Sequence, residues 1–384
     1  MSETRMPSLT VRVRDFRILE SLDWSPQGVC VLSGANGTGK STTLDAFRLL
    51  RALFAWGHES AFRAVDGVAF QRVGAASDAA VEFSIEVEDL VWKLQFPMSA
   101  HGVKGTYGEQ LLRAGEVMLR AAMFEDGWYL GDERQPLDEQ RCCAKVLWDR
   151  ESPAWMQPLV DVLGGIRIHD TYWLNQVKRV EPVSATDSYL HATGRNLWSV
   201  LANWKNAPLR YRGQFEWVMA EARRAFPGLI GTIEFDRGLP YLFCPGATDP
   251  ADGLLPNRAA DGLLTGLLHL TAVAGAKNGS LIAFDEVENQ LHPHAIRALI
   301  SAMRKQADER DLTIVLTTHS PVVLNQFRDD PELVFVLGHG DPDLSVPASM
   351  ADLHSEEWLA QAKLGSLYER LAFGAPPGLD GGDA

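Results

Sequence analysis

The sequence VLSGANGTGKS at residues 31–41 contains a glycine-rich turn, which could hold a phosphate or only join a strand to a helix. It fits the pattern G-x-x-x-x-G-K-[ST]. An apolar run at 28–33 precedes it, and helically spaced apolar residues at 42–55 follow it. Glycines let successive N–H groups point at an anion, and a helix N-terminus adds partial positive charge. The context therefore favours a phosphate-binding loop over a chance match.

The pattern assigns a role to each residue of this loop. Lys40 is expected to reach the β- and γ-phosphates of a nucleotide, and Ser41 is expected to bind Mg²⁺. The other residues expected to contact the nucleotide are Gly34, Ala35, Asn36, Gly37, Thr38, Gly39 and Thr42.

The composition indicates a globular protein. The chain has 384 residues, of which 46% are hydrophobic and 22% are charged, enough for one large domain or two smaller ones. No apolar run approaches the roughly 20 residues of a membrane span, and the first nine residues lack the apolar segment of a secretory signal. Neither a metal-site spacing nor a disulfide framework is evident in the four cysteines, Cys30, Cys142, Cys143 and Cys244. These features predict a reduced, cytoplasmic protein.

The net charge of −14 argues against a protein that coats nucleic acid with its whole surface. It is compatible with a local basic groove. The candidates for such a groove are Lys178, Arg179, Arg210, Arg212, Arg223 and Arg224. An ordinary solvated basic face is the simpler explanation, so direct binding of nucleic acid stays an open alternative.

Alternating apolar residues predict two antiparallel regions. Residues 9–24 alternate and then turn, which predicts a two-stranded hairpin, and residues 79–96 predict further strands of a β lobe beside the nucleotide core. Residues 231–244 predict two more strands around Arg237 and Gly238. Between these regions, helices are expected, including 137–150 and 213–226.

Two further motifs end apolar strands with polar residues. The sequence SLIAFDEVENQLHPH (280–294) ends its strand in Asp285, expected in the Mg²⁺ shell, and Glu286, expected to orient or deprotonate the attacking water. The sequence LTIVLTTHSP (312–321) ends in His319, whose imidazole is expected at the γ-phosphate. Solvated acids and a satisfied core histidine would explain each motif alone. The three motifs together, on three predicted parallel strands, favour a nucleotide-hydrolysing site.

These motifs resemble those of ABC-type ATPases of the RecF/SMC/OLD-like branch, which includes small defence-associated ATPases. GANGTGKST resembles the Walker A motif, LIAFDEVENQLHPH the Walker B motif with its catalytic glutamate and D-loop, and LTTHSP the switch-histidine loop. The resemblance covers roughly residues 8–60 and 230–375. It implies an α/β fold, namely an ABC-type P-loop core with an antiparallel β lobe and an inserted helical lobe. It also implies ATP and Mg²⁺ as cofactors.

The resemblance suggests a division of the chain. Residues 1–100 would form the first half of the ATPase core with the β lobe, and 101–229 an inserted, mainly helical lobe. Residues 230–375 would complete the core, and 376–384 would form a mobile tail. Within the third part, the sequence EEWLAQAKLGSLYERLAFGA resembles the C-terminal helix of the small defence-associated ATPases.

The stretch NRAADGLLTGLLHLTAV (257–273) lies where this branch places its signature helix. Asp261 and Gly262 match the motif, but Ala259 and Ala260 stand where a serine hydroxyl is usual. The resemblance implies a homodimer or higher oligomer with ATP at a head-to-tail interface. Loss of the hydroxyl predicts slow or partner-dependent hydrolysis. Gln176 is the candidate for the Q-loop.

The function implied by this resemblance is a sensor or regulatory ATPase of a bacterial anti-phage defence system, controlling a separate nuclease or toxin. One alternative is a DNA repair or recombination ATPase, which a stoichiometric DNA-binding assay would distinguish. Another is a transporter ATPase subunit, which recovery of a membrane partner would support. A non-hydrolysing scaffold is disfavoured because Asp285, Glu286 and His319 are all present.

The phosphate-loop assignment makes a direct prediction. The substitution Lys40→Ala should abolish nucleotide binding, because it removes the only mobile cation expected at the β- and γ-phosphates. Equilibrium binding of a fluorescent ATP analogue would measure the effect. Wild-type affinity in this variant would refute the assignment.

Overall fold

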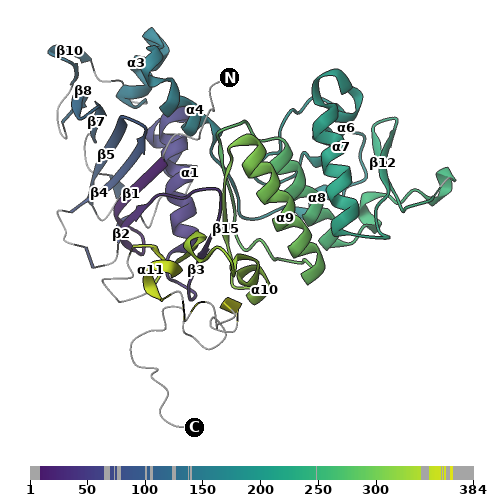
Figure 1. Cartoon of the computed structure of the whole chain (residues 1–384). Helices are drawn as coiled ribbons and strands as arrows, with labels where there is room; N and C mark the ends of the chain where they lie inside the picture. The colour runs from purple at the N-terminus through teal and green to yellow at the C-terminus, as the bar shows by residue number, and fades with distance from the viewer. Residues whose placement is uncertain are drawn as a thin grey trace.

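The computed structural model describes residues 9–64, 70–72, 74–75, 79–99, 102–103, 107–122, 127–136, 138, 141–247, 249–338, 346–355, 357, 359 and 364–365. An antiparallel sheet and a parallel sheet lie side by side, with one long helix, α1 (Lys40–Trp56), between them (Figure 1). Further helices cover the other face of the parallel sheet.

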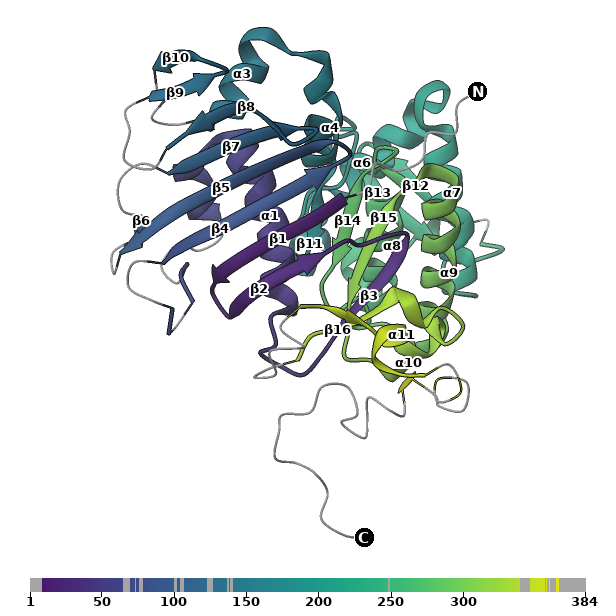
Figure 2. The ribbon, with the colours of Figure 1, turned by 60° about the vertical axis from the view of Figure 1, so that its left-hand side comes forward.

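The predicted hairpin at 9–24 and the strands at 79–96 are confirmed. They form the strands β1 (Leu9–Phe16), β2 (Leu19–Trp24), β4 (Ala80–Val87) and β5 (Leu90–Ser99). These four strands are consecutive in one antiparallel sheet, in the order β5-β4-β1-β2, and β6 (Gly102–Val103) also pairs with β5. Every second residue of β4 is buried in the core on one face of this sheet. The helix α1 lies behind the sheet in Figure 2.

The expectation of a mainly helical lobe at 101–229 is wrong over residues 108–136. This segment extends the antiparallel sheet with β7 (Gly108–Arg113), β8 (Glu116–Ala121), β9 (Gly127–Leu130) and β10 (Glu133–Pro136). Ala114 and Gly115, both with positive φ, make the turn between β7 and β8. Leu111 and Leu119 face each other across this pair and are fully buried. The local sequence pattern here is weak, so pairing with the neighbouring strand β5 decides that this segment forms strands and not helices.

The three predicted strands of the nucleotide core are confirmed as parallel neighbours. The parallel sheet has the order β11-β14-β15-β3-β16-β17, and only its last strand is antiparallel. Its strands are β3 (Val29–Ser33), β11 (Arg167–His169), β14 (Leu281–Phe284), β15 (Thr313–Thr317), β16 (Val334–Val336) and β17 (Ala348–Ser349). Because parallel strands end at one edge, the polar residues that follow β3, β14 and β15 meet there.

Both faces of the parallel sheet are buried, which explains why its strands are almost wholly apolar. One core joins α1 to the antiparallel sheet and to one face of β3. A second core, on the opposite face, contains α6 (Leu197–Asn206), α7 (Pro208–Ala225), α8 (Asp261–Ala274) and α9 (Pro293–Arg310).

The predicted helices are present with shifted boundaries. The helix expected at 137–150 is α3 (Cys143–Glu151), and the helix expected at 213–226 is α7, which begins earlier because Pro208 occupies its first turn. The predicted hairpin at 231–244 is confirmed as β12 (Thr232–Asp236) and β13 (Leu239–Phe243). The other helices are α2 (His58–Ala64), α4 (Gln157–Gly165), α5 (Leu174–Val177), α10 (Pro321–Leu324) and α11 (Met350–Leu353).

Two expectations concern the C-terminal region. Most of the helix expected at 356–375, and the whole tail at 376–384, lie outside the described residues. The domain boundaries stay a prediction.

Every helix in the described part of the chain falls short of the length and apolar character that a membrane span requires. The four cysteines are free, and Cys30, Cys142 and Cys143 are buried.

Glu109 is a fully buried carboxylate that joins β7 to its surroundings. It accepts hydrogen bonds from Trp92 Nε1 at 2.8 Å, from the backbone N–H of Cys143 at 2.6 Å and from that of Ala144 at 2.9 Å. The last two donors lie in the first turn of α3, whose N–H groups have no partner within the helix. Glu109 therefore connects β5, β7 and α3.

Removing this carboxylate should destabilise the fold. We expect Glu109→Ala to lower the free energy of unfolding by about 3 kcal/mol or more, because three buried donors lose their acceptor. Glu109→Gln retains one carbonyl oxygen and should cost less. Urea denaturation of the two variants and the wild type would measure the difference. Equal stability of Glu109→Ala and the wild type would contradict this role.

Candidate nucleotide site

The loop at residues 34–39 follows β3 and leads directly into α1. Gly34 has φ +152°, and a Cβ there would lie 2.4 Å from the carbonyl oxygen of Leu337. Gly39 has φ +105°, and a Cβ there would lie 2.6 Å from Leu19 Cδ2. Only glycine fits at these two positions, so the neighbouring strands fix the path of the loop.

Lys40 is only 6% exposed, and its ammonium group lies over the loop. Its Nζ donates to the carbonyl oxygens of Gly34 at 2.9 Å and Ala35 at 3.0 Å. Burial lowers the pKa of Lys40, although the nearby carboxylates of Asp285, Glu286 and Glu288 act in the opposite direction. The first turn of α1 contains no acidic side chain. The loop therefore presents a half-desolvated cation and the positive end of a helix, a combination that suits a phosphate.

The side chain of Asp285 connects α1 to the ends of two strands of the parallel sheet, β14 and β15. Ser41 Oγ donates to Asp285 Oδ2 at 2.8 Å, and Thr317 Oγ1 donates to Asp285 Oδ1. Ser41 lies in the first turn of α1, Asp285 directly follows β14, and Thr317 is the last residue of β15. A hydroxyl and a carboxylate are the ligand types that Mg²⁺ accepts alongside phosphate oxygens and water. The two residues predicted to hold Mg²⁺ therefore fit it.

Glu286 follows Asp285 and has φ +48°, a strained value for a residue with a side chain. Its backbone N–H donates to Thr317 Oγ1 at 2.8 Å, which holds this conformation. Its exposed carboxylate accepts a hydrogen bond from Asn289 Nδ2 at 2.8 Å. Glu286 is thus anchored by its backbone and oriented by a neighbouring amide, while its carboxylate stays accessible to water.

His319 is half-buried at the same edge. Glu288 accepts hydrogen bonds from Thr318 Oγ1 and from the backbone N–H of His319, both at 2.8 Å. Burial, followed by the positive charge of Lys40, lowers the pKa of His319. Its imidazole is therefore neutral at neutral pH, and one of its ring nitrogens can donate a hydrogen bond.

Sequence reasoning missed three residues of this arrangement, Thr317, Glu288 and Asn289. All three lie inside the quoted motifs, so their positions were visible. Their roles depend on which neighbouring strand they face, and the chain order of the motifs does not contain that information.

Comparisons with known proteins agree with the overall fold. A family model described as "AAA domain, putative AbiEii toxin, Type IV TA system" matches residues 251–325. Among solved structures, an Smc head bound to the C-winged helix domain of ScpA matches with TM-score 0.52 and 12% identity, covering 83% of this chain and 91% of that chain. The chain has the ABC-type P-loop ATPase fold of an SMC head.

Two further SMC heads are similar at lower scores. The head domain with an extended coiled coil bound to the C-terminal domain of ScpA, from Pyrococcus furiosus, has TM-score 0.49 and 11% identity, covering 91% of this chain and 98% of that chain. The SMC head domain from Thermotoga maritima has TM-score 0.43 and 13% identity, covering 89% and 98%. No curated protein matches the sequence.

The expected signature residues of this ABC-type chain lie on a different element, the N-terminus of α8. Asp261 forms an ion pair with Lys178, and a Cβ at Gly262 would lie 2.6 Å from the carbonyl oxygen of Gln290. These contacts within one chain do not join Asp261 and Gly262 to the loop at 34–39. Their role as nucleotide contacts stays a prediction, as does that of Gln176 in α5.

The basic residues singled out in the sequence are mostly held by local contacts. Lys178 pairs with Asp261, Arg179 approaches Glu181 at 3.9 Å, and Arg224 pairs with Glu221 at 2.6 Å. Arg223 Nε donates to the carbonyl oxygen of Gly231 at 2.7 Å. Arg210 lies over the ring of Tyr211, and the side chain of Arg212 is outside the described residues. A continuous basic strip through these residues stays untested.

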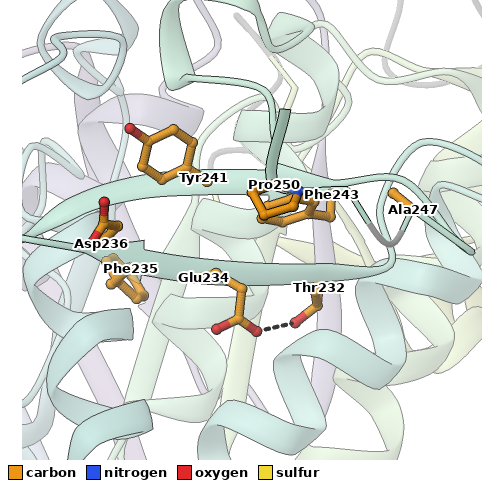
Figure 3. A pocket seen from close by; sticks show the side chains of 8 residues that line it. All are labelled: Thr232, Glu234, Phe235, Asp236, Tyr241, Phe243, Ala247 and Pro250. Atoms are coloured by element: carbon orange, nitrogen blue, oxygen red, sulfur yellow. Dashed lines mark hydrogen bonds between the residues drawn. The ribbon is translucent and has the colours of Figure 1, made fainter. Parts of the chain in front are cut away.

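A cavity of about 500 Å³ lies along the β12–β13 hairpin, separate from the nucleotide edge (Figure 3). Its walls carry Glu234 and Asp236 together with Tyr241 and Phe243, and Thr232 Oγ1 donates to Glu234 at 3.3 Å. Two carboxylates make this cavity unsuitable for a phosphate.

The two hydrogen bonds of the Thr317 hydroxyl predict that it positions both Asp285 and Glu286. Thr317→Val keeps the side-chain shape but removes the hydroxyl that holds Asp285 and the N–H of Glu286. We expect ATP hydrolysis to fall about 10–100-fold, the usual effect of losing a group that orients metal ligands. Steady-state phosphate release would measure it. Thr313→Val, at the other end of β15, is the matched control and should hydrolyse at the wild-type rate; equal rates in the two variants would contradict the role of Thr317.

Proposed function

We propose that this protein binds and hydrolyses ATP and uses the nucleotide to switch between two states of a dimer. The cluster at one edge of the parallel sheet carries this proposal: the buried Lys40, the Ser41–Asp285 contact, and the anchored Glu286. Each of these groups is positioned by a different element, and each suits a different part of an ATP–Mg²⁺ complex.

Ground-state binding is the task of the loop and Lys40. The N–H groups at residues 34–39 and the N-terminus of α1 would bind the phosphates, and Lys40 would move from its carbonyl partners to the β- and γ-phosphates. Ser41 and Asp285 would hold Mg²⁺, which would neutralise charge on the phosphate oxygens. Asn36, exposed at the loop tip, and Thr42, in the first turn of α1, would complete the cradle.

Hydrolysis is the task of Glu286 and His319. Glu286 would accept a proton from the attacking water, with Asn289 and Thr317 holding it in place. The neutral His319 would donate a hydrogen bond to the γ-phosphate, while Glu288 fixes its backbone. The charge that develops on the phosphate would be stabilised by Lys40.

The second chain would supply the signature helix. Asp261 and Gly262 begin α8, and the N–H groups of this first turn could face the γ-phosphate of a partner subunit. Ala260 occupies the N-cap position, where a serine hydroxyl would normally add a hydrogen bond to a charged group worth about 1.5–3 kcal/mol. Slow or partner-dependent hydrolysis would follow from its absence.

The match of residues 251–325 to a family described with an AbiEii toxin supports a role in defence. We infer a sensor or regulatory subunit of a bacterial anti-phage system that controls a separate nuclease or toxin. The alternative is a DNA repair or recombination ATPase that binds DNA directly.

Glu286→Gln tests the switch. ATP should still bind, because Lys40 and Asp285 are intact, while hydrolysis should fall about 10²–10⁴-fold through loss of the general base. Removing a negative charge beside the γ-phosphate should also favour the ATP-bound dimer. Size-exclusion chromatography with ATP and Mg²⁺ should show a persistent dimer or larger assembly, whereas the wild type relaxes with turnover. Normal hydrolysis by the variant would show that Glu286 is not the base.

The same variant tests the defence role in cells. A bacterial host carrying this gene with its neighbouring genes should lower phage plating, and Glu286→Gln should remove that protection. Equal plating with and without the wild-type locus would refute the defence role and leave the ATPase proposal standing. Tight, stoichiometric retention of DNA would then favour the repair alternative.

A further inference from the structure

A second candidate site lies beside β11, the outer strand of the parallel sheet. Two adjoining cavities of about 280 and 480 Å³ share the lining residues Arg167, His169, Tyr189 and Leu190. We refer to the two together as the basic cavity. Their volumes are in the range of small-ligand sites. None of the residues assigned to the nucleotide site lines either cavity.

The lining of the basic cavity is strongly cationic. Its basic side chains are Arg48, Arg51, Arg167, Arg210 and Lys277. Among the residues that the structure describes, no aspartate or glutamate lines either cavity. In a chain with a net charge of −14, this separation of charge creates a local positive potential that favours an anion.

Arg51 and Arg167 are the two arginines of the basic cavity that most favour a bound anion. Both are half-buried, and burial lowers the pKa of each, with the charge of Arg51 further lowering that of Arg167. In the described part of the chain neither has a carboxylate partner: Arg167 donates to the carbonyl oxygens of Gly164 and Ile166, at 2.7 and 2.8 Å. Arg48, by contrast, pairs with Asp170 at 2.8 Å. Two partly desolvated like charges would be stabilised by an anion between them.

Aromatic rings accompany these arginines. Trp56 and Tyr189 are 54% and 43% exposed, which is unusual for large aromatic side chains. The Arg51 guanidinium lies 5.6 Å from the Trp56 ring, and that of Arg167 lies 5.0 Å from the Tyr189 ring. Exposed aromatic faces beside arginines are the arrangement on which nucleic-acid bases stack while phosphates are bound.

We propose that the basic cavity binds a phosphorylated nucleotide unit, with its phosphate between Arg51 and Arg167 and its base on Tyr189 or Trp56. The unit could be a free nucleotide or the end of a single strand, because both present the same phosphate and base. This site is separate from the ATP site and is lined by different residues.

The basic cavity is connected to the nucleotide edge by two elements. Arg48 and Arg51 lie on α1, the helix that begins at Lys40. His169 lines the cavity, and its carbonyl oxygen accepts the backbone N–H of Asp285 at 2.9 Å. A ligand in the basic cavity would therefore contact elements that also position the phosphate loop and the Mg²⁺ ligand.

Two probes test the proposal on the full-length protein. A fluorescein-labelled 12-nucleotide oligothymidylate would be followed by anisotropy across a salt series, with unlabelled 5′-TMP as competitor. TMP lacks the β- and γ-phosphates expected to engage Lys40. The double variant Arg51→Gln/Arg167→Gln should weaken binding about tenfold or more and flatten the salt dependence. Tyr189→Ala should weaken it about 5- to 150-fold through lost stacking.

Matched controls separate this site from a general charge effect. Arg297→Gln removes one positive charge from an exposed position of α9 that lines neither cavity, and it should bind as the wild type does. The double variant should keep its melting temperature, because it removes like charges without carboxylate partners. Displacement by TMP identifies a free nucleotide, and displacement by unlabelled oligonucleotide alone identifies a strand end.

The proposal fails if the wild type binds neither probe. It also fails if the double variant and Tyr189→Ala both bind as tightly as Arg297→Gln. Should the double variant melt at a lower temperature, Tyr189→Ala alone decides the result, because its side chain is exposed and its loss leaves the core intact.

Discussion

The pair of hydrogen bonds to Asp285 is the interaction on which the rest of the nucleotide site depends. One carboxylate oxygen accepts from Ser41 and the other from Thr317, so a single side chain ties the start of α1 to the ends of β14 and β15. The same Thr317 hydroxyl accepts the N–H of Glu286. The positions of Asp285, the proposed Mg²⁺ ligand, and of Glu286, the proposed base, are therefore not independent. Both follow from the placement of β15 between β14 and β3.

That placement is enforced by the two hydrophobic cores, which meet at the parallel sheet. The core around α1 joins the phosphate loop to the antiparallel sheet, and the core around α8 joins the proposed signature helix to the opposite face. An ion pair also joins α1 to the antiparallel sheet, because Asp45 of α1 pairs with Arg17 at the β1–β2 turn. Asp45 pairs with Arg48 of the same helix as well. Since packed interiors deform little, a change at the nucleotide edge would move these elements as units.

Charge is distributed unevenly over this acidic protein. Near the start of α1, Lys40 is partly desolvated and lies near the carboxylates of Asp285, Glu286 and Glu288. Near its end, Arg51 lines a cavity with Arg167 of β11, and both are partly desolvated; no carboxylate is found among the described residues of that lining. A bound anion would lower the cost of burying each of these cations. One helix therefore carries two places where a phosphate would be stabilised, and only the first is marked by a sequence motif.

The sequence by itself determined the glycine-rich loop between β3 and α1, the polar residues at the ends of β14 and β15, and the hairpins at 9–24 and 231–244. These features depend on local properties: glycine backbone angles, alternation along a strand, and the residue that directly follows an apolar run. Only the tertiary structure decided that β7, β8, β9 and β10 extend the antiparallel sheet, that Thr317 bonds to both Asp285 and Glu286, and that Arg51 and Arg167 line one cavity. The physical reason is that hydrogen-bond partners and electrostatic neighbours are set by which strands and helices pack together, and residues far apart in the chain carry no local signal of that packing.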